Sequence, residues 1–185
     1  MRIVAGSAKG VRLAPVPAGV RPLSDRAREG LFSSLGHEVP GARVLDLFAG
    51  TGAMGIEALS RGAEHAVFVD RSPEALAAVY DNLERARVAE HATVVTSRAL
   101  AFVSAGSGEG GPFHLILIDP PYGYGPAELD DLLERVSSGW LDPKGWTVVL
   151  TRGHKSSTPV IPLHWSAARE LRYGDSRLHL YRPQE

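Results

Sequence analysis

The sequence contains no cysteine, which excludes disulfide bonds, thiolate metal sites and cysteine nucleophiles. Its seven histidines never fall at the short spacings that zinc sites favour, so we expect no metal ion. No apolar run approaches the ~18 residues of a membrane span, and the N-terminus lacks the apolar stretch of a signal peptide. These absences predict a soluble cytoplasmic protein with no membrane partner.

The 185 residues that are present suit a single domain, residues 1–185. The content of 44% hydrophobic and 22% charged residues is typical of a globular chain with a packed core. Charge is uneven: Lys and Arg outnumber Asp and Glu by six to two in residues 1–35 and by seven to three in residues 144–185, whereas residues 36–143 hold seven against sixteen. The basic ends allow contact with a polyanion, although charge runs are more often solvated surface.

Strand-like apolar runs alternate with helical patterns from residue 43 onward, which predicts an α/β fold with a mostly parallel sheet. Two further segments flank a turn at residues 173–176 and predict an antiparallel hairpin at the C-terminal edge, giving a seven-stranded sheet. The expected strands are Arg43–Leu47, Ala66–Val69, Thr93–Thr96, His114–Ile118, Trp146–Leu150, Ile161–Leu171 and Arg177–Tyr181.

Residues 1–36 are expected to extend this core, which comprises residues 37–185. Apolar segments at Arg2–Ala5 and Val11–Ala14 surround a turn and predict a small β-hairpin. Ser24 is a suitable N-cap for a helix over Ser24–Leu35.

A glycine-rich loop, Gly50 to Gly55, joins the first predicted strand to a helix. Glycines at such a turn let backbone N–H groups approach a ligand, and Asp70 ends the next strand, where a carboxylate can hold a ribose. The residues from Gly50 to Gly55 also match the Gly-x-Gly-x-x-Gly motif of dinucleotide-binding proteins, which is weak evidence by itself. Asp46 separates the two interpretations, because it would repel the phosphates of NAD and attract an ammonium group. This loop resembles that of Rossmann-like, class I S-adenosylmethionine-dependent methyltransferases.

The fourth predicted strand ends in Asp119-Pro120-Pro121-Tyr122. Two prolines stop a strand and hold the chain rigidly, but a simple terminator requires neither the acid nor the aromatic ring. The tetrapeptide resembles the signature of methyltransferases that act on planar exocyclic or amide nitrogens. Asp119 and the Pro120 carbonyl can accept hydrogen bonds from the amine, while Tyr122 stacks on the base. Methylation of pyrimidine carbon 5 normally needs a cysteine, so its absence also favours nitrogen.

The N-terminal block is similar to that of the RsmD family, which methylates the exocyclic N2 amine of one guanine in 16S ribosomal RNA of the small subunit. The resemblance extends from Arg2 to Tyr181 and includes Arg21 to Glu29, Asp46 to Glu57 and Asp119 to Tyr122. It implies that S-adenosylmethionine is converted to S-adenosylhomocysteine without a metal ion. By position, it implies cofactor contacts from Asp46, Phe48, Ala49, Gly50, Thr51, Gly52, Asp70, Arg71, Arg98 and Ala99, and base contacts from Asp119, Pro120, Pro121 and Tyr122.

The basic residues of the N-terminal block are candidates for phosphate contacts, because a basic hairpin beside the cleft can grip an RNA backbone. They are Arg2, Lys9, Arg12, Arg21, Arg26 and Arg28. Arg26 has an alternative role facing the cofactor carboxylate. We expect a monomer that binds ribosomal RNA or the small ribosomal subunit.

Other functions remain open from the sequence. The same tetrapeptide serves DNA adenine-N6 or cytosine-N4 amino-methyltransferases, although this chain has no separate target-recognition domain. Methylation of a protein glutamine poses the same chemical problem. A non-catalytic RNA-binding factor and an NAD oxidoreductase are the alternatives from other classes.

Overall fold

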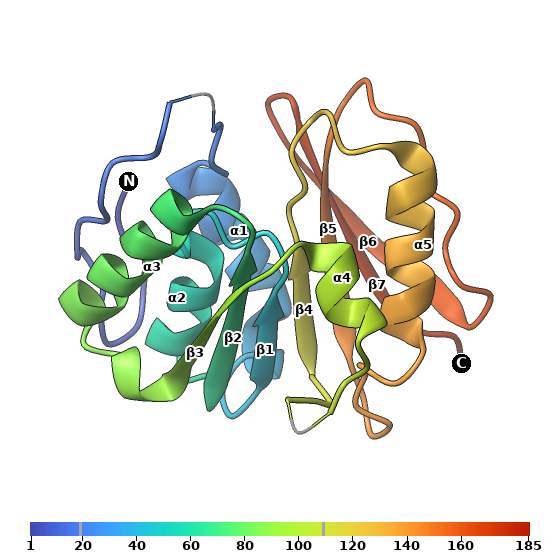
Figure 1. Cartoon of the computed structure of the whole chain (residues 1–185), viewed down its shortest axis with the longest axis horizontal. Helices are drawn as coiled ribbons and strands as arrows, with labels where there is room; N and C mark the ends of the chain where they lie inside the picture. Colours follow the sequence, from blue (N-terminus) through green and yellow to red (C-terminus); the bar gives the residue numbers. More distant parts are fainter. Residues whose placement is uncertain (19, 109) are drawn as a thin grey trace.

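The computed structural model describes residues 1–18, 20–108 and 110–185 and shows one seven-stranded sheet in the order β3-β2-β1-β4-β5-β7-β6 (Figure 1). The first five strands in the chain are parallel, and β7 pairs antiparallel with both β5 and β6. The predicted mostly parallel sheet with an antiparallel C-terminal hairpin is therefore confirmed. The strands are β1 Arg43–Asp46, β2 His65–Asp70, β3 Ala92–Thr96, β4 Leu115–Ile118, β5 Thr147–Gly153, β6 Trp165–Tyr173 and β7 Ser176–Pro183.

Helices cover both faces of the sheet. Helices α1 (Asp25–Leu35), α2 (Ala53–Ser60) and α3 (Pro73–Ala86) cover one face, while α4 (Ala99–Ser104) and α5 (Pro126–Ser137) cover the other. Short 3-10 turns lie at Gly36–Glu38 and Ala89–His91. Among the described helices, none is long and apolar enough to cross a membrane.

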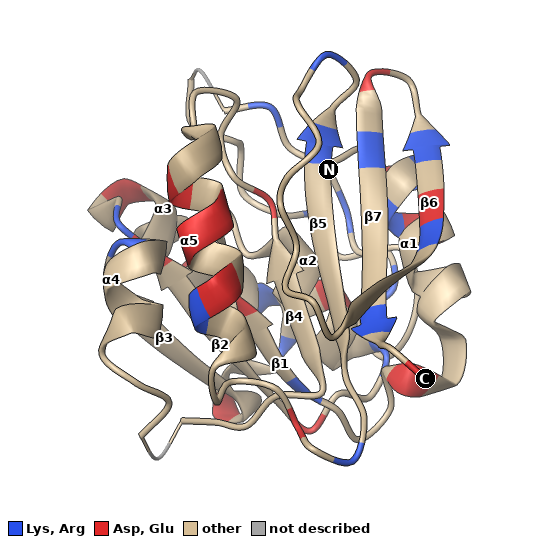
Figure 2. Ribbon diagram, turned by 90° about the vertical axis from the view of Figure 1, so that its right-hand side faces the viewer, with Lys and Arg blue, Asp and Glu red and all other residues tan. Residues whose placement is uncertain are grey.

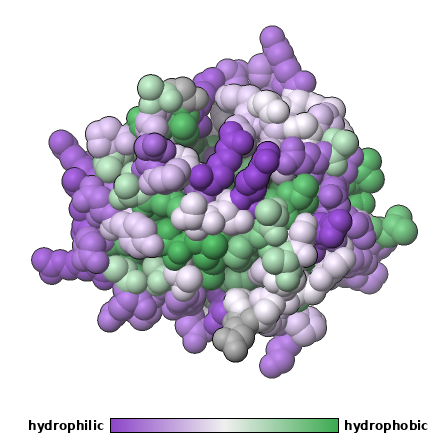
Figure 3. Space-filling view, in the orientation of Figure 1, coloured by the Kyte–Doolittle hydropathy of each residue, from purple (hydrophilic) through white to green (hydrophobic). Residues whose placement is uncertain are grey.

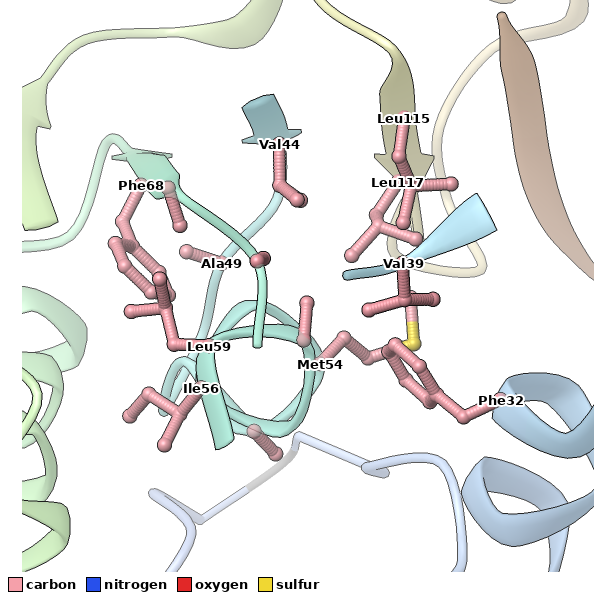
Figure 4. Close-up of a cluster of buried hydrophobic side chains, with 14 of the residues drawn as sticks. Phe32, Val39, Val44, Ala49, Met54, Ile56, Leu59, Phe68, Leu115 and Leu117 are labelled. Atoms are coloured by element: carbon pink, nitrogen blue, oxygen red, sulfur yellow. The ribbon is translucent and has the colours of Figure 1, made fainter. Parts of the chain in front are cut away.

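Each central strand contributes side chains to two separate cores. Val44 packs toward α1 and α2, whereas its neighbour Leu45 packs toward α4 and α5, as the alternation of a strand requires. In the first core, Met54 of α2 lies between the sheet and Phe32 of α1 (Figure 4). A strand buried on both faces is necessarily apolar throughout, which explains why β4 reads Leu-Ile-Leu-Ile.

The N-terminal helix begins as predicted, because Ser24 caps it by accepting a hydrogen bond from the Ala27 N–H. The predicted hairpin ahead of it is only partly correct. Arg2 and Arg12 form a single antiparallel bridge, and neither flanking segment is a strand. The segment instead packs on the core through Ile3 and Leu13, which are both buried. We call residues 1–18 the N-terminal arm.

Candidate active site

Parallel strands bring the loops that follow them to one edge of a sheet, and here that edge gathers the predicted site. The glycine-rich loop follows β1, Asp70 ends β2 and Asp119 follows β4, all at the upper edge in Figure 1. Strongly hydrophilic residues lie above the centre of this view, whereas many hydrophobic ones gather across its middle (Figure 3). The structure therefore brings together residues that are 73 positions apart in the chain, from Asp46 to Asp119.

The glycine-rich loop requires glycine at two kinds of position. Gly50 and Gly52 have φ values of 56° and 79°, a left-handed conformation that side chains disfavour. Gly55 serves close packing instead, because a Cβ there would lie 2.3 Å from the Phe68 ring of β2. At Gly50, by contrast, a Cβ would meet no atom within 4 Å, so space remains above the loop.

Asp70 holds the loop from the adjacent strand. Its Oδ2 accepts a hydrogen bond from the Gly50 N–H at 2.9 Å, and its Oδ1 accepts one from the Ser72 N–H at 2.9 Å. Each carboxylate oxygen retains acceptor capacity for a further donor. Asp70 thus orders the glycine-rich loop and remains chemically able to hold a ligand hydroxyl.

Asp46 lies buried beneath the same loop, where its Oδ2 accepts a hydrogen bond from the Gly55 N–H at 3.1 Å. Burial raises the pKa of Asp46 from 3.8 to about 7. The neighbouring charges of Asp119 and Asp70 contribute to this rise in pKa, while hydrogen bonds from the backbone N–H groups of Gly55 and Phe48 oppose it. Three carboxyl groups therefore surround one site, and a cationic ligand would relieve their mutual repulsion.

Asp119 and Tyr122 stand in different environments. Asp119 is partly buried at the end of β4, and burial raises its pKa from 3.8 to about 6. Tyr122 is 65% exposed, and a Cβ on Gly153 of β5 would lie 2.9 Å from its Cε1 atom. Gly153 thus leaves room for the aromatic ring beside the end of β5. Between them, Pro120 is partly buried and Pro121 is exposed.

The remaining predicted cofactor residues border the same edge. Phe48 is partly buried, while Ala49 and Thr51 are buried in the loop. Arg71 is exposed just after β2, and Arg98 is the exposed N-cap of α4, next to buried Ala99. Sequence reasoning missed Tyr124, whose ring packs edge-on against Phe48 with centroids 5.1 Å apart. Its position two residues after the tetrapeptide was the available signal.

One predicted RNA contact is wrong. Arg28 is completely buried and forms ion pairs with Asp25 and with Glu57, the latter at 3.2 Å, and it donates to the Arg2 carbonyl at 2.7 Å. It therefore cannot reach RNA. The sequence spacing could have predicted this burial, because residue 28 shares one face of a helix with the apolar residues 31, 32 and 35.

The turn of the N-terminal arm does not lie beside the cleft as expected. Lys9 is exposed, but its neighbour Ala8 donates its N–H to the Ser60 hydroxyl at 2.9 Å. Ser60 ends α2, which starts at the glycine-rich loop and returns toward the opposite edge of the sheet. Lys9 is thus placed away from Asp119. Arg2, Arg12, Arg21 and Arg26 are all exposed.

A surface hollow of about 560 Å³ adjoins the tetrapeptide. Tyr122 and Tyr124 line it from the loop after β4, and Gly153 lines it from β5. Its basic lining residues include Arg21, which the sequence analysis proposed, and three that it missed: Arg152, His154 and Lys155. The excess of Lys and Arg in residues 144–185 was the signal for these.

Comparison with known proteins identifies relatives over the whole chain. A family model described as Conserved hypothetical protein 95 matches residues 1–182. The chain is 36% identical over 184 residues to Ribosomal RNA small subunit methyltransferase D of Escherichia coli, covering 98% of this chain and 89% of that protein. The protein of the same name from Haemophilus influenzae is 30% identical over 183 residues, covering 98% and 93%.

A solved structure agrees with these sequence relatives. The structure described as "Putative methyltransferase yhhF from Escherichia coli" matches with a TM-score of 0.86 at 32% identity, covering 100% of this chain and 98% of that one. The predicted Rossmann-like, class I methyltransferase fold and the resemblance drawn from the N-terminal block are both confirmed. The chain belongs to the RsmD family of methyltransferases, whose family model is described as Conserved hypothetical protein 95.

Proposed function

We propose that this protein transfers a methyl group from S-adenosylmethionine to the exocyclic N2 amine of a guanine in small-subunit ribosomal RNA, acting as a monomer in the cytoplasm. The observation that carries the proposal is the group of three carboxylates around the glycine-rich loop, beside an exposed aromatic ring. The names of the relatives, which are small-subunit ribosomal RNA methyltransferases, support the same substrate.

The three carboxylates around the glycine-rich loop fit S-adenosylmethionine better than a dinucleotide. The cofactor has two positive charges, an ammonium and a sulfonium, which Asp46, Asp70 and Asp119 would attract. The diphosphate of NAD would be repelled by the same three carboxylates. Asp70 would accept from the ribose hydroxyls, and Arg71, Arg98 and Ala99 would border the remainder of the cofactor. The open space above Gly50 supports close approach of a ligand to the loop.

The chemistry of the target amine explains the tetrapeptide. An exocyclic amine delocalises its lone pair into the ring, so it is a poor nucleophile while it remains planar. Asp119 and the Pro120 carbonyl would accept its two N–H groups and favour a pyramidal nitrogen. When bound, S-adenosylmethionine supplies an electrophilic methyl group on its sulfonium. The carboxylate of Asp119 also stabilises the positive charge that develops on nitrogen.

Tyr122 would stack on the guanine, which must leave its helix or lie in an exposed loop. A side chain that is 65% exposed next to the reacting carboxylate is available for such stacking. Loss of the extra proton from nitrogen can follow methyl transfer. No strong general base is therefore required.

Transfer of labelled methyl to small ribosomal subunits, protein-free ribosomal RNA and duplex DNA, followed by nucleoside analysis, tests the proposal. We expect N2-methylguanosine from the ribosomal substrates. Label found only in DNA would overturn the RNA substrate, and label in none of the three would redirect the search to protein glutamine. Nucleoside analysis also distinguishes nitrogen from carbon methylation.

Asp119→Ala tests the catalytic assignment. Loss of a group that stabilises the transition state should lower kcat by about 100-fold or more. Cofactor affinity should fall much less, because Asp46 and Asp70 remain to attract the cofactor. Asp81→Ala removes an exposed carboxylate from α3 and serves as the matched control. Unchanged turnover in the Asp119 variant would refute the assigned role.

A further inference from the structure

Most of the charged or titratable side chains that line the hollow beside Tyr122 are basic. Arg21, Arg152, His154 and Lys155 line it, and Asp175 is the acid among the lining residues that the structure describes. Lys and Arg residues gather at the upper ends of β5, β6 and β7 and in the loop that follows β5 (Figure 2). An anionic ligand would therefore be attracted to this side of the site.

The cations of this hollow differ in whether they already have a partner. Asp175 lies 3.6 Å from an Arg21 nitrogen and 3.4 Å from His154 Nδ1. Among the residues with described positions, neither Arg152 nor Lys155 has an ion-pair partner. The Nε atom of Arg152 is also buried without a hydrogen-bond partner in that part of the chain. The charge of Arg152 is thus without a partner among the described residues, and an anion bound in the hollow would stabilise it.

The positions of Arg152 and Lys155 limit which anion could bind in the hollow. Arg152 is the second-last residue of β5, followed by Gly153, against which the Tyr122 ring lies, and Lys155 comes two residues later. A base stacked on Tyr122 would have its own ribose and phosphates within one nucleotide's length of this strand end. The anions with the best access to the hollow are thus the phosphates on either side of the methylated nucleotide.

We propose that Arg152 and Lys155, together with Arg21, bind the backbone phosphates that flank the target nucleotide. This inference rests on the proposed function, because it assumes that a nucleic-acid base occupies the site next to Tyr122. Arg21 belongs to the segment that follows the N-terminal arm, and its contact with Asp175 brings it to the β6–β7 turn. The contact surface is therefore built from segments at opposite ends of the chain.

Arg152→Gln with Lys155→Gln removes both charges and retains long polar side chains. We expect KM for small ribosomal subunits to rise about tenfold for each lost charged hydrogen bond, with little change in kcat. The slope of log KM against log salt should also fall by about one for each charge removed. Cofactor affinity, measured by calorimetry, should stay unchanged and shows that the variant is folded.

Two further variants keep the test independent of folding. Lys155→Gln alone changes an exposed side chain and should show about half of the logarithmic effect. Lys144→Gln is the matched control, because Lys144 is an exposed lysine in the turn that precedes the same strand. It should match the parent protein in KM and in salt dependence.

The outcomes separate this inference from the proposed function. If the parent protein methylates RNA and the double variant keeps its KM and salt slope, the phosphate site is wrong and the proposed function stands. If the parent protein methylates no RNA, both fail. An equal effect from Lys144→Gln would also overturn the site, because it would show a general charge effect.

Discussion

The two basic ends of the chain have the same net charge by sequence, +4 each, but the fold uses them differently. In residues 1–35, Arg28 is buried in an ion-pair network and Lys9 lies toward the edge of the sheet opposite the active site. In residues 144–185, Arg152 and Lys155 line the hollow beside Tyr122. Arg21 of residues 1–35 also lines this hollow. A basic segment is thus relevant to nucleic-acid contact only through those residues that the fold brings to the edge of the sheet where Tyr122 lies.

Glu57 of α2 explains why Arg28 of the N-terminal segment is buried. This buried carboxylate accepts the Val4 N–H at 2.9 Å and the Ala5 N–H at 3.0 Å, and it pairs with Arg28 and with Arg61. It therefore attaches the N-terminal arm to the helix that follows the glycine-rich loop. Asn82 adds a second attachment, accepting the Ala14 N–H at 2.7 Å and donating to the Thr51 carbonyl at 2.8 Å.

Arg28→Ala should produce the largest effect on stability and thereby sharpen the contrast between the two ends. Removing Arg28 leaves Arg61 as the remaining cation paired with buried Glu57 among the described residues, so the buried network loses one of its two compensating charges. We expect a loss of about 3 kcal/mol in the free energy of unfolding. Arg26→Ala, its exposed neighbour on the same helix, should change stability by less than about 0.5 kcal/mol. Urea denaturation of both variants checks this, and equal stabilities would contradict the structural role of Arg28.

The pH dependence of cofactor binding should distinguish the carboxylate site from the basic hollow. Asp46 has a raised pKa of about 7, so it is ionised above that pH and neutral below it. If the ammonium group requires the charged form, cofactor affinity should be constant above pH 7 and weaken by up to about tenfold per pH unit below it. Calorimetry between pH 5.5 and about 8.5 measures this. Asp46→Asn should flatten the profile, and an unchanged profile would contradict the role of Asp46.

Stability should respond to the same group in the opposite direction. The pKa of Asp46 is about 7 in the folded state and 3.8 when unperturbed, so its contribution to stability is fully present below pH 3.8 and is lost as the pH rises to about 7. Asp46→Asn should therefore be more stable than the parent protein at pH 8, and the difference should shrink as the pH falls toward 4. Denaturation at the two pH values checks the sign.

Gly153→Ala should lower turnover, but by less than Asp119→Ala does. The added methyl group would lie 2.9 Å from the Tyr122 ring, so the ring must move from its place beside β5. We expect kcat on RNA to fall about threefold to tenfold, since misplaced substrate contacts lower the rate without removing catalytic groups. Gly123→Ala, in the same loop as Tyr122 but with open space around its Cβ position, is the control. If both variants behave alike, the position of the ring does not matter.

Lys9→Gln should have the smallest effect on KM, and it directly tests the contrast between the two basic ends of the chain. Since Lys9 is anchored beside the end of α2, its loss should change KM for small subunits by less than about twofold. KM should be measured for Lys9→Gln and Lys155→Gln under the same salt conditions. A larger effect from Lys9 than from Lys155 would reverse the assignment of the two ends.

The strands, the glycine-rich loop and the tetrapeptide were all predictable, because each depends on residues that are close in sequence. Apolar runs of four to seven residues identify buried strands, and Gly50 and Gly52 follow one directly. The predicted N-terminal hairpin was only partly correct, because part of its backbone bonds to distant side chains. The two segments of the N-terminal arm do pair, for example through the Ile3 N–H and the Val11 carbonyl at 3.0 Å. The N–H groups of Val4, Ala5 and Ala8, however, bond to the side chains of Glu57 and Ser60, so the pairing does not continue into two strands.

The sequence by itself determined the fold class, the family and the identity of the three carboxylates, since these depend on local patterns and on motifs. Only the tertiary structure decided which charges are available to a ligand. Burial of Arg28 and the exposure of Lys155 depend on helices and strand ends that pack together from distant parts of the chain. The raised pKa of Asp46 likewise depends on desolvation and on the nearby Asp70 and Asp119, which local sequence does not specify.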